Sequence, residues 1–444
     1  MSDLFIIGSS GTKAYRTAMA AISENIANAS TDGFARRTVT TTESGASNAT
    51  MATYNSRANF GGTQVSSVNR ASDPYLDATV RATAMALGSA TARQRWLGDT
   101  ETALNDTGTG VGQLMTSMYQ NMEKLAASPD DKSLRVTTLD SISRVAQAFN
   151  QTAVDLQNVS SGIATEAQSA VGTVNQALSS LADINNSLLR AQPGTSAYAQ
   201  LLDSRDAALA DLSENLNVTI SFGAHDSATV TFGGQTLVSG NNAASIAVAA
   251  NSDGTLALSM ADGTALTAPA SGTLGGLFSA ADTVADRRTE LDDLAAQFVT
   301  DMNDWHDDGL TNDGTTGGAL LSGTSAATIA ALITDPDQLA TRSADGTKNG
   351  NLLNVNTALR GNGSVEQSWT SLIASHANLL SSTNAEYDTA SSRNDQAIAA
   401  REAVSGVDLD TEAADLLRVQ QAYSGCAKIL QVAKETIQSI LDIM

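Results

Sequence analysis

The sequence predicts a mainly α-helical, elongated, multi-domain protein with a small β-rich domain inserted into it. Three observations predict this fold class. Apolar residues recur at helical spacing near both ends of the chain, strand-like alternation is confined to the middle, and aromatic residues make up only 4% of the 444 residues. Cores poor in aromatics are built from Ala, Leu, Val and Ile, which suit closely packed helices. The length predicts two or three domains rather than one core.

The first helix is expected to end near Ala29. One stripe along it is apolar with small gaps, and steps by three and four residues through Phe5, Gly8, Thr12, Tyr15, Met19, Ile22 and Ile26. The neighbouring stripe holds small residues and ends in two amides, Asn25 and Asn28. This pattern predicts an amphipathic helix that packs on other helices.

The last helix has a stronger pattern. Its apolar seam consists of Leu416, Val419, Tyr423, Cys426, Leu430, Ala433, Ile437, Ile440 and Met444, with Leu409, Ala413 and Leu417 beside it. A coiled-coil-like seam of this kind needs a partner, because an isolated helix is marginally stable in water. We expect the first helix to be that partner, which defines a terminal helical domain made of residues 1–45 and 405–444.

The middle of the chain is predicted to contain a region of strands with helices before and after it in sequence. Helical patterns occupy 74–105, 111–128, 133–189 and 201–216, and again 280–305 and 365–401. In residues 216–281, apolar and polar residues alternate or β-branched residues follow one another. Gly, Asn and Asp separate these short stretches, as in strands that are joined by hairpin turns. We therefore expect a helical middle domain at 46–215 and 282–404 and an outer β-rich domain at 216–281. This nested order predicts that the two ends of the chain lie together.

Composition excludes several classes of function. The net charge of −22 argues against nucleic acid and anionic membranes as partners. No apolar run is long enough to span a membrane, and the amino-terminal residues lack the pattern of a signal peptide, so export would use another route. Cys426 is the single cysteine, which excludes an internal disulfide; on the apolar seam it is expected to act as a small hydrophobe.

Catalytic and metal-binding patterns are not found. His225, His306 and His376 lie in separate segments without metal-ligand spacing, and the segment "DWHDDG" at 304–309 lacks the closing Glu of a calcium loop. The glycine-rich "GTGVGQ" at 108–113 follows a polar helix, which favours a turn between helices over a phosphate-binding loop. We expect no enzymatic activity, no metal and no cofactor.

Both ends carry motifs that resemble a known family. The segment "NIANASTDGFARR" (25–37) resembles the amino-terminal motif of bacterial flagellar rod, hook and hook-associated axial proteins, through Asn25, Asn28, Thr31, Gly33 and Phe34. At the other end, "SGVDLD" (405–410) and "QQAY" (420–423) resemble the carboxyl helix of the same proteins. Segments 123–135, 201–218, 291–309 and 333–340 are similar to the hook-associated members that form the first junction between hook and filament.

The resemblance implies a structural, self-assembling subunit of the hook–filament junction. It implies type III export from the cytoplasm to the extracellular flagellum, and contacts with the hook protein, with a second junction protein (hook-associated protein 3) and with an export chaperone. The alternatives are another axial protein, such as a hook or distal rod subunit, or a carbohydrate-binding surface adhesin that uses the β-rich domain.

The asparagines have two interpretations. An Asn in a helical seam can fix the register between subunits, or it can cap a helix inside one copy. We favour packing between subunits. The expected assembly interface is Ile22, Asn25, Ile26, Asn28, Thr31, Gly33, Phe34, Leu409, Leu416, Val419, Gln420, Tyr423, Leu430, Ile437 and Ile440. The resemblance implies a chaperone site on Leu416, Leu430, Ile437 and Leu441.

Overall fold

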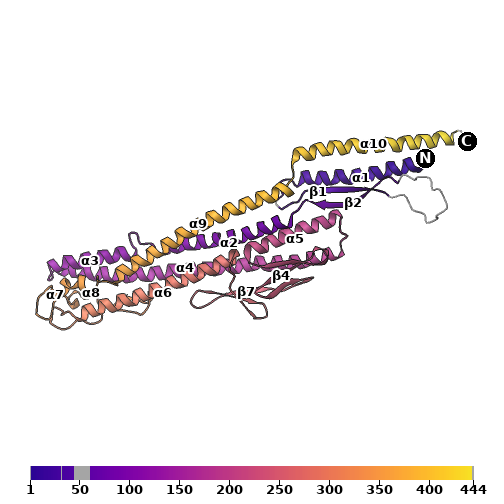
Figure 1. The fold of residues 1–444 in the computed structure, drawn as a ribbon. Coiled ribbons are helices and arrows are strands. Elements are labelled where there is room, and N and C mark those ends of the chain that lie inside the picture. The colour runs from indigo at the N-terminus through magenta and orange to yellow at the C-terminus, as the bar shows by residue number, and fades with distance from the viewer. Residues whose placement is uncertain (1, 32, 45–60, 443–444) are drawn as a thin grey trace. The chain divides into compact units, whose positions relative to one another are not determined.

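The fold was analysed in a computed structural model that describes residues 2–31, 33–44 and 61–442 (Figure 1). About 65% of the chain is helical, with small antiparallel sheets, so the predicted mainly α fold is confirmed. By its internal contacts the chain separates into two compact units. Unit 1 holds Met1–Met85, Thr173–Ser245 and Ser391–Met444, and unit 2 holds Ala86–Gly172 and Ile246–Ala390. No helix in the described part of the chain has the length and apolar character to cross a membrane.

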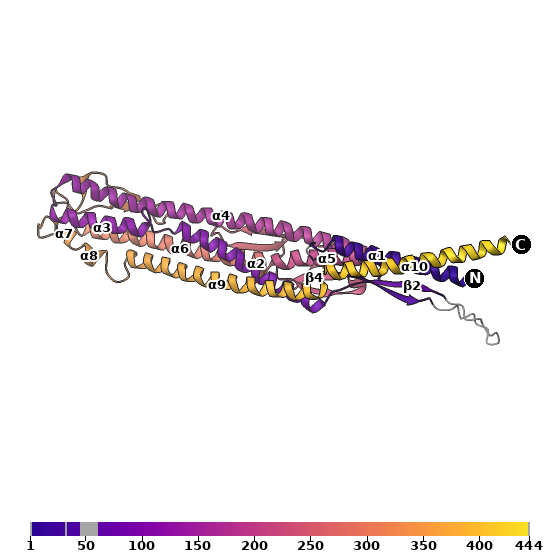
Figure 2. The ribbon, with the colours of Figure 1, turned by 90° about the horizontal axis from the view of Figure 1, so that it is seen from above.

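The terminal helices of unit 1 pack against each other. Helix α1 (Ser2–Ala27) and helix α10 (Leu409–Leu441) lie side by side and antiparallel, with the two ends of the chain at the same end of the pair (Figures 1 and 2). A Cβ added at Gly8 would lie 2.8 Å from Leu430 Cγ, and one at Gly11 would lie 2.6 Å from Cys426 Sγ. These two glycines therefore allow the helices to approach closely. The predicted pairing of the chain ends is confirmed.

A hairpin and a short helix pack beside α1. Strands β1 (Arg37–Glu43) and β2 (Thr63–Arg70) are antiparallel, with an irregular register between Thr40 and Thr41. Helix α5 (Ser196–Asn215) is preceded by Thr195, whose side chain accepts a hydrogen bond from the Tyr198 amide. Such an N-cap satisfies one of the free amides of the first helical turn.

The predicted strands form two sheets rather than one. Strands β3 (Thr219–Phe222), β4 (Ala228–Phe232), β5 (Gln235–Ser239) and β6 (Asn242–Ala243) form an antiparallel sheet in unit 1. Strands β7 (Ile246–Ala250), β8 (Leu256–Met260) and β9 (Ala265–Leu266) form a second one in unit 2. The short helix η1 (Ala224–Asp226) joins β3 to β4. The division into three domains, with a β-rich domain at 216–281, stays a prediction.

Helix α6 (Gly272–Asp307) begins earlier than the expected start at Ala280. The glycine at its start has a φ of 77° and follows the extended residue Ser271. Leu274, Leu277 and Phe278 then fall at helical spacing and are buried. Their burial explains why the helical segment extends into a region that the sequence pattern assigned to strands.

The core of unit 2 is built mainly from helices. Helix α3 (Val111–Ala127) and helix α6 contribute to it together with parts of α2 (Pro74–Ala103), α4 (Lys132–Arg190) and α9 (Val365–Ser405). Phe149 lies 5.8 Å from Phe298 and 6.4 Å from Trp369, measured between ring centroids. Residues 108–110 form a turn before α3, as predicted. The remaining elements are β10 (Leu321–Ser322), β11 (Ala330–Ala331), η2 (Pro336–Gln338), α7 (Gly350–Leu353) and α8 (Val355–Ala358).

A buried arginine holds the long loop that follows α6. Arg135 is 1% exposed and no described carboxylate lies within 4 Å of its guanidinium. It donates instead to the carbonyl oxygens of Pro129 (2.7 Å), Pro336 (3.1 Å) and Leu339 (3.0 Å), and to Asn312 Oδ1 (2.8 Å) and Thr341 Oγ1 (2.7 Å). The cation thus replaces its water shell with five oxygens from three segments.

Replacing Arg135 by Met is expected to lower the free energy of unfolding by about 3 kcal/mol or more, because buried carbonyl groups lose a charged donor. Urea unfolding followed by circular dichroism measures the change. The matched control is Arg144→Met on the exposed face of the same helix, where only an exposed pair with Asp140 is lost and the change should stay below about 0.5 kcal/mol. Equal losses in both variants would contradict this role of Arg135.

His306 fixes the same loop through both ring nitrogens. The side chain is fully buried; Nδ1 lies 2.6 Å from the Gly318 carbonyl oxygen, and Nε2 accepts the Ala340 amide at 3.0 Å. The neutral ring with its proton on Nδ1 satisfies both contacts, whereas a second proton would repel the Ala340 amide. Burial lowers the pKa of His306 below 6.5, although its hydrogen bond to Gly318 acts in the opposite direction.

Because the folded-state pKa is lowered, the contribution of His306 to the free energy of unfolding is fully present above pH 6.5. This contribution is lost as the pH falls from 6.5 towards the lowered pKa. A His306→Gln variant should be less stable than the parent at pH 7.5, and its stability should fall less between pH 6.5 and pH 5. Thermal unfolding across this pH range provides the measurement. His376, which is also buried with a lowered pKa, is present in both proteins, so the difference between parent and variant reports on His306. An equal loss of stability between pH 6.5 and pH 5 in both proteins would contradict this role of His306.

Candidate assembly interface

The amino-terminal motif first closes helix α1. Asn28 Nδ2 donates to the Glu24 carbonyl oxygen at 2.9 Å, and Asn28 Oδ1 accepts from Thr31 Oγ1 at 3.3 Å. Gly33 follows with a φ of 76°, a conformation that favours glycine. The ring of Phe34 lies beneath the Arg37 guanidinium, whose Cζ is 5.1 Å from the ring centroid. Asn28 therefore ends a helix and shapes the turn towards β1.

Asn25 has a different role from Asn28. Its side chain is fully buried; Nδ2 donates to the Arg37 carbonyl oxygen (2.9 Å) and to Glu412 Oε2 (3.0 Å), and Oδ1 accepts from the Arg37 amide (2.8 Å). Glu412, also fully buried, accepts from Arg36 Nε at 2.5 Å. One amide thus joins α1, the start of β1 and α10 within a single copy. Its assignment to packing between subunits stays a prediction.

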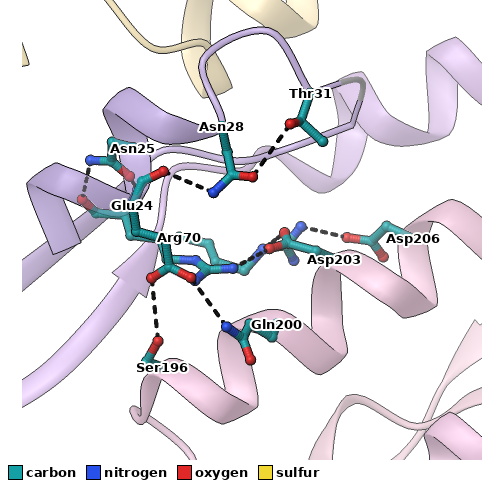
Figure 3. Close-up of polar contacts among 10 residues, drawn as sticks. Glu24, Asn25, Asn28, Thr31, Arg70, Ser196, Gln200, Asp203 and Asp206 are labelled. Atoms are coloured by element: carbon teal, nitrogen blue, oxygen red, sulfur yellow. Dashed lines mark hydrogen bonds and ion pairs between the residues drawn. The ribbon is translucent and has the colours of Figure 1, made fainter. Parts of the chain in front are cut away.

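Two arginines tie helix α5 to the same region (Figure 3). Arg37 forms ion pairs with Glu24 and, through Nη2, with Asp203 Oδ2 at 2.7 Å. Arg70 reaches Asp203 Oδ1 at 2.7 Å and Asp206 Oδ2 at 2.9 Å. Because the arginines come from the hairpin and the aspartates from α5, these pairs hold the hairpin against α5.

Glu24 completes this connection from α1. Besides the pair with Arg37, its carboxylate accepts from Gln200 Nε2 at 3.1 Å and from Ser196 Oγ at 3.5 Å (Figure 3). Burial alone would raise the pKa of Glu24, but the hydrogen bond and the charge of Arg37 outweigh it and lower the pKa. The carboxylate is therefore ionised at neutral pH. None of the sequence motifs predicted a role for Glu24, Arg37, Arg70, Asp203 or Glu412. The paired Arg36-Arg37 and the "DSRD" at 203–206 are the only local patterns that point to these ion pairs.

The predicted interface residues fall into three groups in a single copy. Ile22, Asn25 and Val419 are buried. Half-buried members are Ile26, Asn28, Phe34, Leu416 and Leu430, and exposed members are Thr31, Gly33, Leu409, Gln420, Tyr423, Ile437 and Ile440. Leu441 of the expected chaperone site is also exposed, and Met444 lies outside the described residues. The seam of α10 is therefore only partly covered by α1.

Exposed apolar side chains gather where the chain begins and ends. Leu4, Phe5 and Ile6 of α1 are 47–51% exposed, and Ile437, Ile440 and Leu441 of α10 are 41–60% exposed. We call these six residues the terminal apolar cluster. Both helix ends lie at the same end of the antiparallel pair (Figure 1). Large apolar side chains left exposed at the ends of two paired helices indicate an interaction site.

Comparison with known proteins gives the family. Residues 97–321, half of the chain, match the model for the flagellar hook-associated protein FlgK helical domain. The chain belongs to the flagellar hook-associated protein FlgK family. The two ends match broader axial-protein families, since residues 6–34 match the flagella basal body rod protein model and residues 402–443 match the flagellar basal body rod FlgEFG protein C-terminal model. Residues 402–443 contain all of α10, and residues 6–34 contain most of α1.

Individual relatives of the FlgK family agree with this result. Flagellar hook-associated protein 1 of Bacillus subtilis is 26% identical over 500 residues, covering 97% of this chain and 96% of the relative. The Salmonella typhimurium protein of the same name is 25% identical, and the match spans 72% of this chain and 60% of that protein. The solved structure of the flagellar hook junction protein FlgK from Burkholderia pseudomallei has a similar fold, with a TM-score of 0.50 and 22% identity over 55% of this chain and 46% of that one.

Membership of the FlgK family makes the chain a structural subunit of the bacterial flagellum at the junction between hook and filament. The family and the function that the sequence motifs predicted are confirmed. The model for the helical domain decides against a hook or distal rod subunit, because only the terminal models are those of rod proteins. The adhesin alternative depended on three phenylalanines: Phe232 and Phe278 are buried, and Phe222, 47% exposed, lies beneath the Arg205 guanidinium with its ring centroid 4.6 Å from Cζ.

Replacing Asn25 by Ala is expected to destabilise the terminal pair by about 2–3 kcal/mol, because it leaves Glu412 and the Arg37 peptide group buried with fewer partners. Hydrogen exchange of the purified chain should then become faster in α1 and α10. Thr31→Ala removes a single long hydrogen bond at an exposed position and should change the stability by less than about 0.5 kcal/mol. Unchanged exchange in Asn25→Ala would show that the amide does not hold the pair together.

Proposed function

We propose that copies of this chain assemble into the junction through the terminal pair, with a division of tasks along its residues. The buried residues Ile22, Asn25 and Val419 set the geometry of the pair within each copy. The exposed residues of the predicted interface, above all Tyr423, Ile437 and Ile440, contact neighbouring copies. The observation that carries this proposal is the terminal apolar cluster, whose six apolar residues are 41–60% exposed in a single copy.

The other predicted interface residues have two roles. Four of them set the direction in which the chain leaves α1 for the hairpin, namely Asn28, Thr31, Gly33 and Phe34. Ile26, Leu416 and Leu430 are half-buried, so each has surface available to both the pair and a neighbour. Leu409 and Gln420 are exposed on α10 and extend the contact surface away from the cluster.

The partners in the proposal follow from the position of the junction. The chain binds itself, the hook protein on one side and hook-associated protein 3 on the other, in the extracellular flagellum. A head-to-tail array presents different surfaces at its two ends, which suits a part that must join two different proteins. The proposal assigns the chain a structural task with no catalytic activity.

A chaperone is proposed to cover α10 before export. Of the four residues assigned to it, Ile437 and Leu441 are exposed, whereas Leu416 and Leu430 are half-buried and Leu430 lies against Gly8 of α1. A chaperone that binds all four residues therefore binds α10 before α1 does. Pairing of the terminal helices and chaperone binding exclude each other in this proposal.

The proposal is tested with Ile437→Asp/Ile440→Asp in cells that lack the wild-type chain. The two charges should prevent burial between copies, so that hooks form without filaments. Because Ile437 also belongs to the proposed chaperone site, Ile440→Asp alone, which leaves that site intact, should still be secreted and should also lower the number of filaments. Electron microscopy with an antibody to this chain, and immunoblots of the medium, provide the readouts. Ser439→Asp places the same charge at an exposed polar position of the same turn and should leave filaments intact. Normal filaments in the double variant would refute the proposal.

A further inference from the structure

A groove lies beside α1 on the face that α10 leaves free. Its volume is about 510 Å³, and its walls include Phe5, Ile6, Ser10 and Lys13 from α1 and Thr63 and Val65 from β2. Residues 6, 10, 13 and 17 line it at helical spacing. Gly8 and Gly11, which contact α10, point to another side of the same helix. The groove therefore lies in the angle between α1 and the hairpin, away from the helix pair.

The groove has apolar walls and one cation at its edge. Phe5 and Ile6 are about half exposed, which leaves apolar surface open to the solvent. Lys13 is exposed, and no described carboxylate lies within 4 Å of its amine. An apolar segment followed by an acidic residue would match this surface both in hydrophobicity and in charge.

The carboxyl-terminal turns of α10 have this chemistry. Ile437, Ile440 and Leu441 are exposed, and Asp442 follows directly. This segment cannot enter the groove of its own copy, because the same helix already lies on the other face of α1 through Cys426 and Leu430. The occupant must come from another molecule.

We propose that this groove receives the end of α10, with Ile437, Ile440 and Leu441, from a second copy of the chain, and that Lys13 pairs with Asp442 of that copy. The inference rests on the proposed assembly through the terminal helices and specifies its contact. Groove and inserted helix end are different surfaces, so each copy offers one of each. Contacts of this heterologous kind repeat from copy to copy into a ring or a helical array.

Disulfide trapping in assembled flagella tests the contact. In a Cys426→Ser background, one tagged chain carries Gln64→Cys at the groove and a second, differently tagged chain carries Ile440→Cys. Cells that express both chains are expected to yield, after mild oxidation of isolated flagella, a covalent dimer that bears both tags. Thr40→Cys, on the hairpin but outside the groove, is the matched control and should give no mixed dimer with Ile440→Cys. Absence of the mixed dimer from flagella that contain both chains would overturn the proposal.

Charge reversal tests the pairing of Lys13 with Asp442. Each of Lys13→Glu and Asp442→Lys should lower the yield of the mixed dimer about two- to fivefold, as expected for an exposed ion pair, and the two together on opposite copies should restore it. Arg16→Glu, on an exposed part of α1 that does not line the groove, should leave the yield unchanged. No restoration by the double reversal would overturn the pairing.

The result also separates this inference from the proposed function. If Ile437→Asp/Ile440→Asp abolishes filaments but Gln64→Cys and Ile440→Cys form no mixed dimer, the terminal helices assemble and the groove is not their site. If Gln64→Cys instead links to another flagellar protein, the second copy is excluded as the occupant.

Discussion

A buried hydrogen bond between an amide and a carboxylate determines the arrangement of the chain ends. Asn25 and Glu412 are 387 positions apart in sequence, and both are fully buried where α1 meets α10. A buried carboxyl group requires hydrogen-bond donors, and Glu412 receives them from Asn25 and from Arg36. No shift of the two helices by one turn preserves these contacts. The polar pair therefore specifies the register that the apolar seam alone would leave open.

The same region connects the pair to the rest of unit 1. The strand that starts at Arg37 is held by the backbone bonds to Asn25, while the Arg37 side chain reaches Glu24 and Asp203. Charged hydrogen bonds therefore connect the helix pair to α5 in addition to the covalent chain. The amino-terminal motif therefore connects the α1–α10 pair to the rest of unit 1.

The sequence was sufficient to predict the helices, the pairing of the chain ends and the family, because apolar spacing and short motifs are local properties. Helix α4 and helix α9 lie within a few residues of their predicted bounds. The separation of the strands into two sheets depends on contacts such as the bonds from Asn185 to Ala228 and Gly240, which no spacing reveals. The buried position of Glu412 cannot be predicted from spacing either, because an acidic residue on a helix is normally exposed to solvent.

The lengths of the paired helices also explain which predicted residues are covered. Leu430 lies against Gly8 of α1, so only the first residues of α1 remain beside the part of α10 that follows Leu430. Val419 and Ala433 face α1, whereas Ile437 and Ile440 lie near the end of the pair and remain exposed. Pattern alone cannot separate residues that bury within one copy from those that bury between copies.

The contact between the groove of one copy and the α10 end of the next determines which surfaces remain free where an array of copies ends. If the array closes into a ring, every groove is filled and no helix end is left over. If it ascends as a spiral, the lowest and highest copies keep one unfilled groove and one uncovered α10 end on opposite rims. The neighbouring protein on one side would then meet an empty groove, and the protein on the other side would meet a free end of α10. This difference would give the junction a polarity without any additional domain.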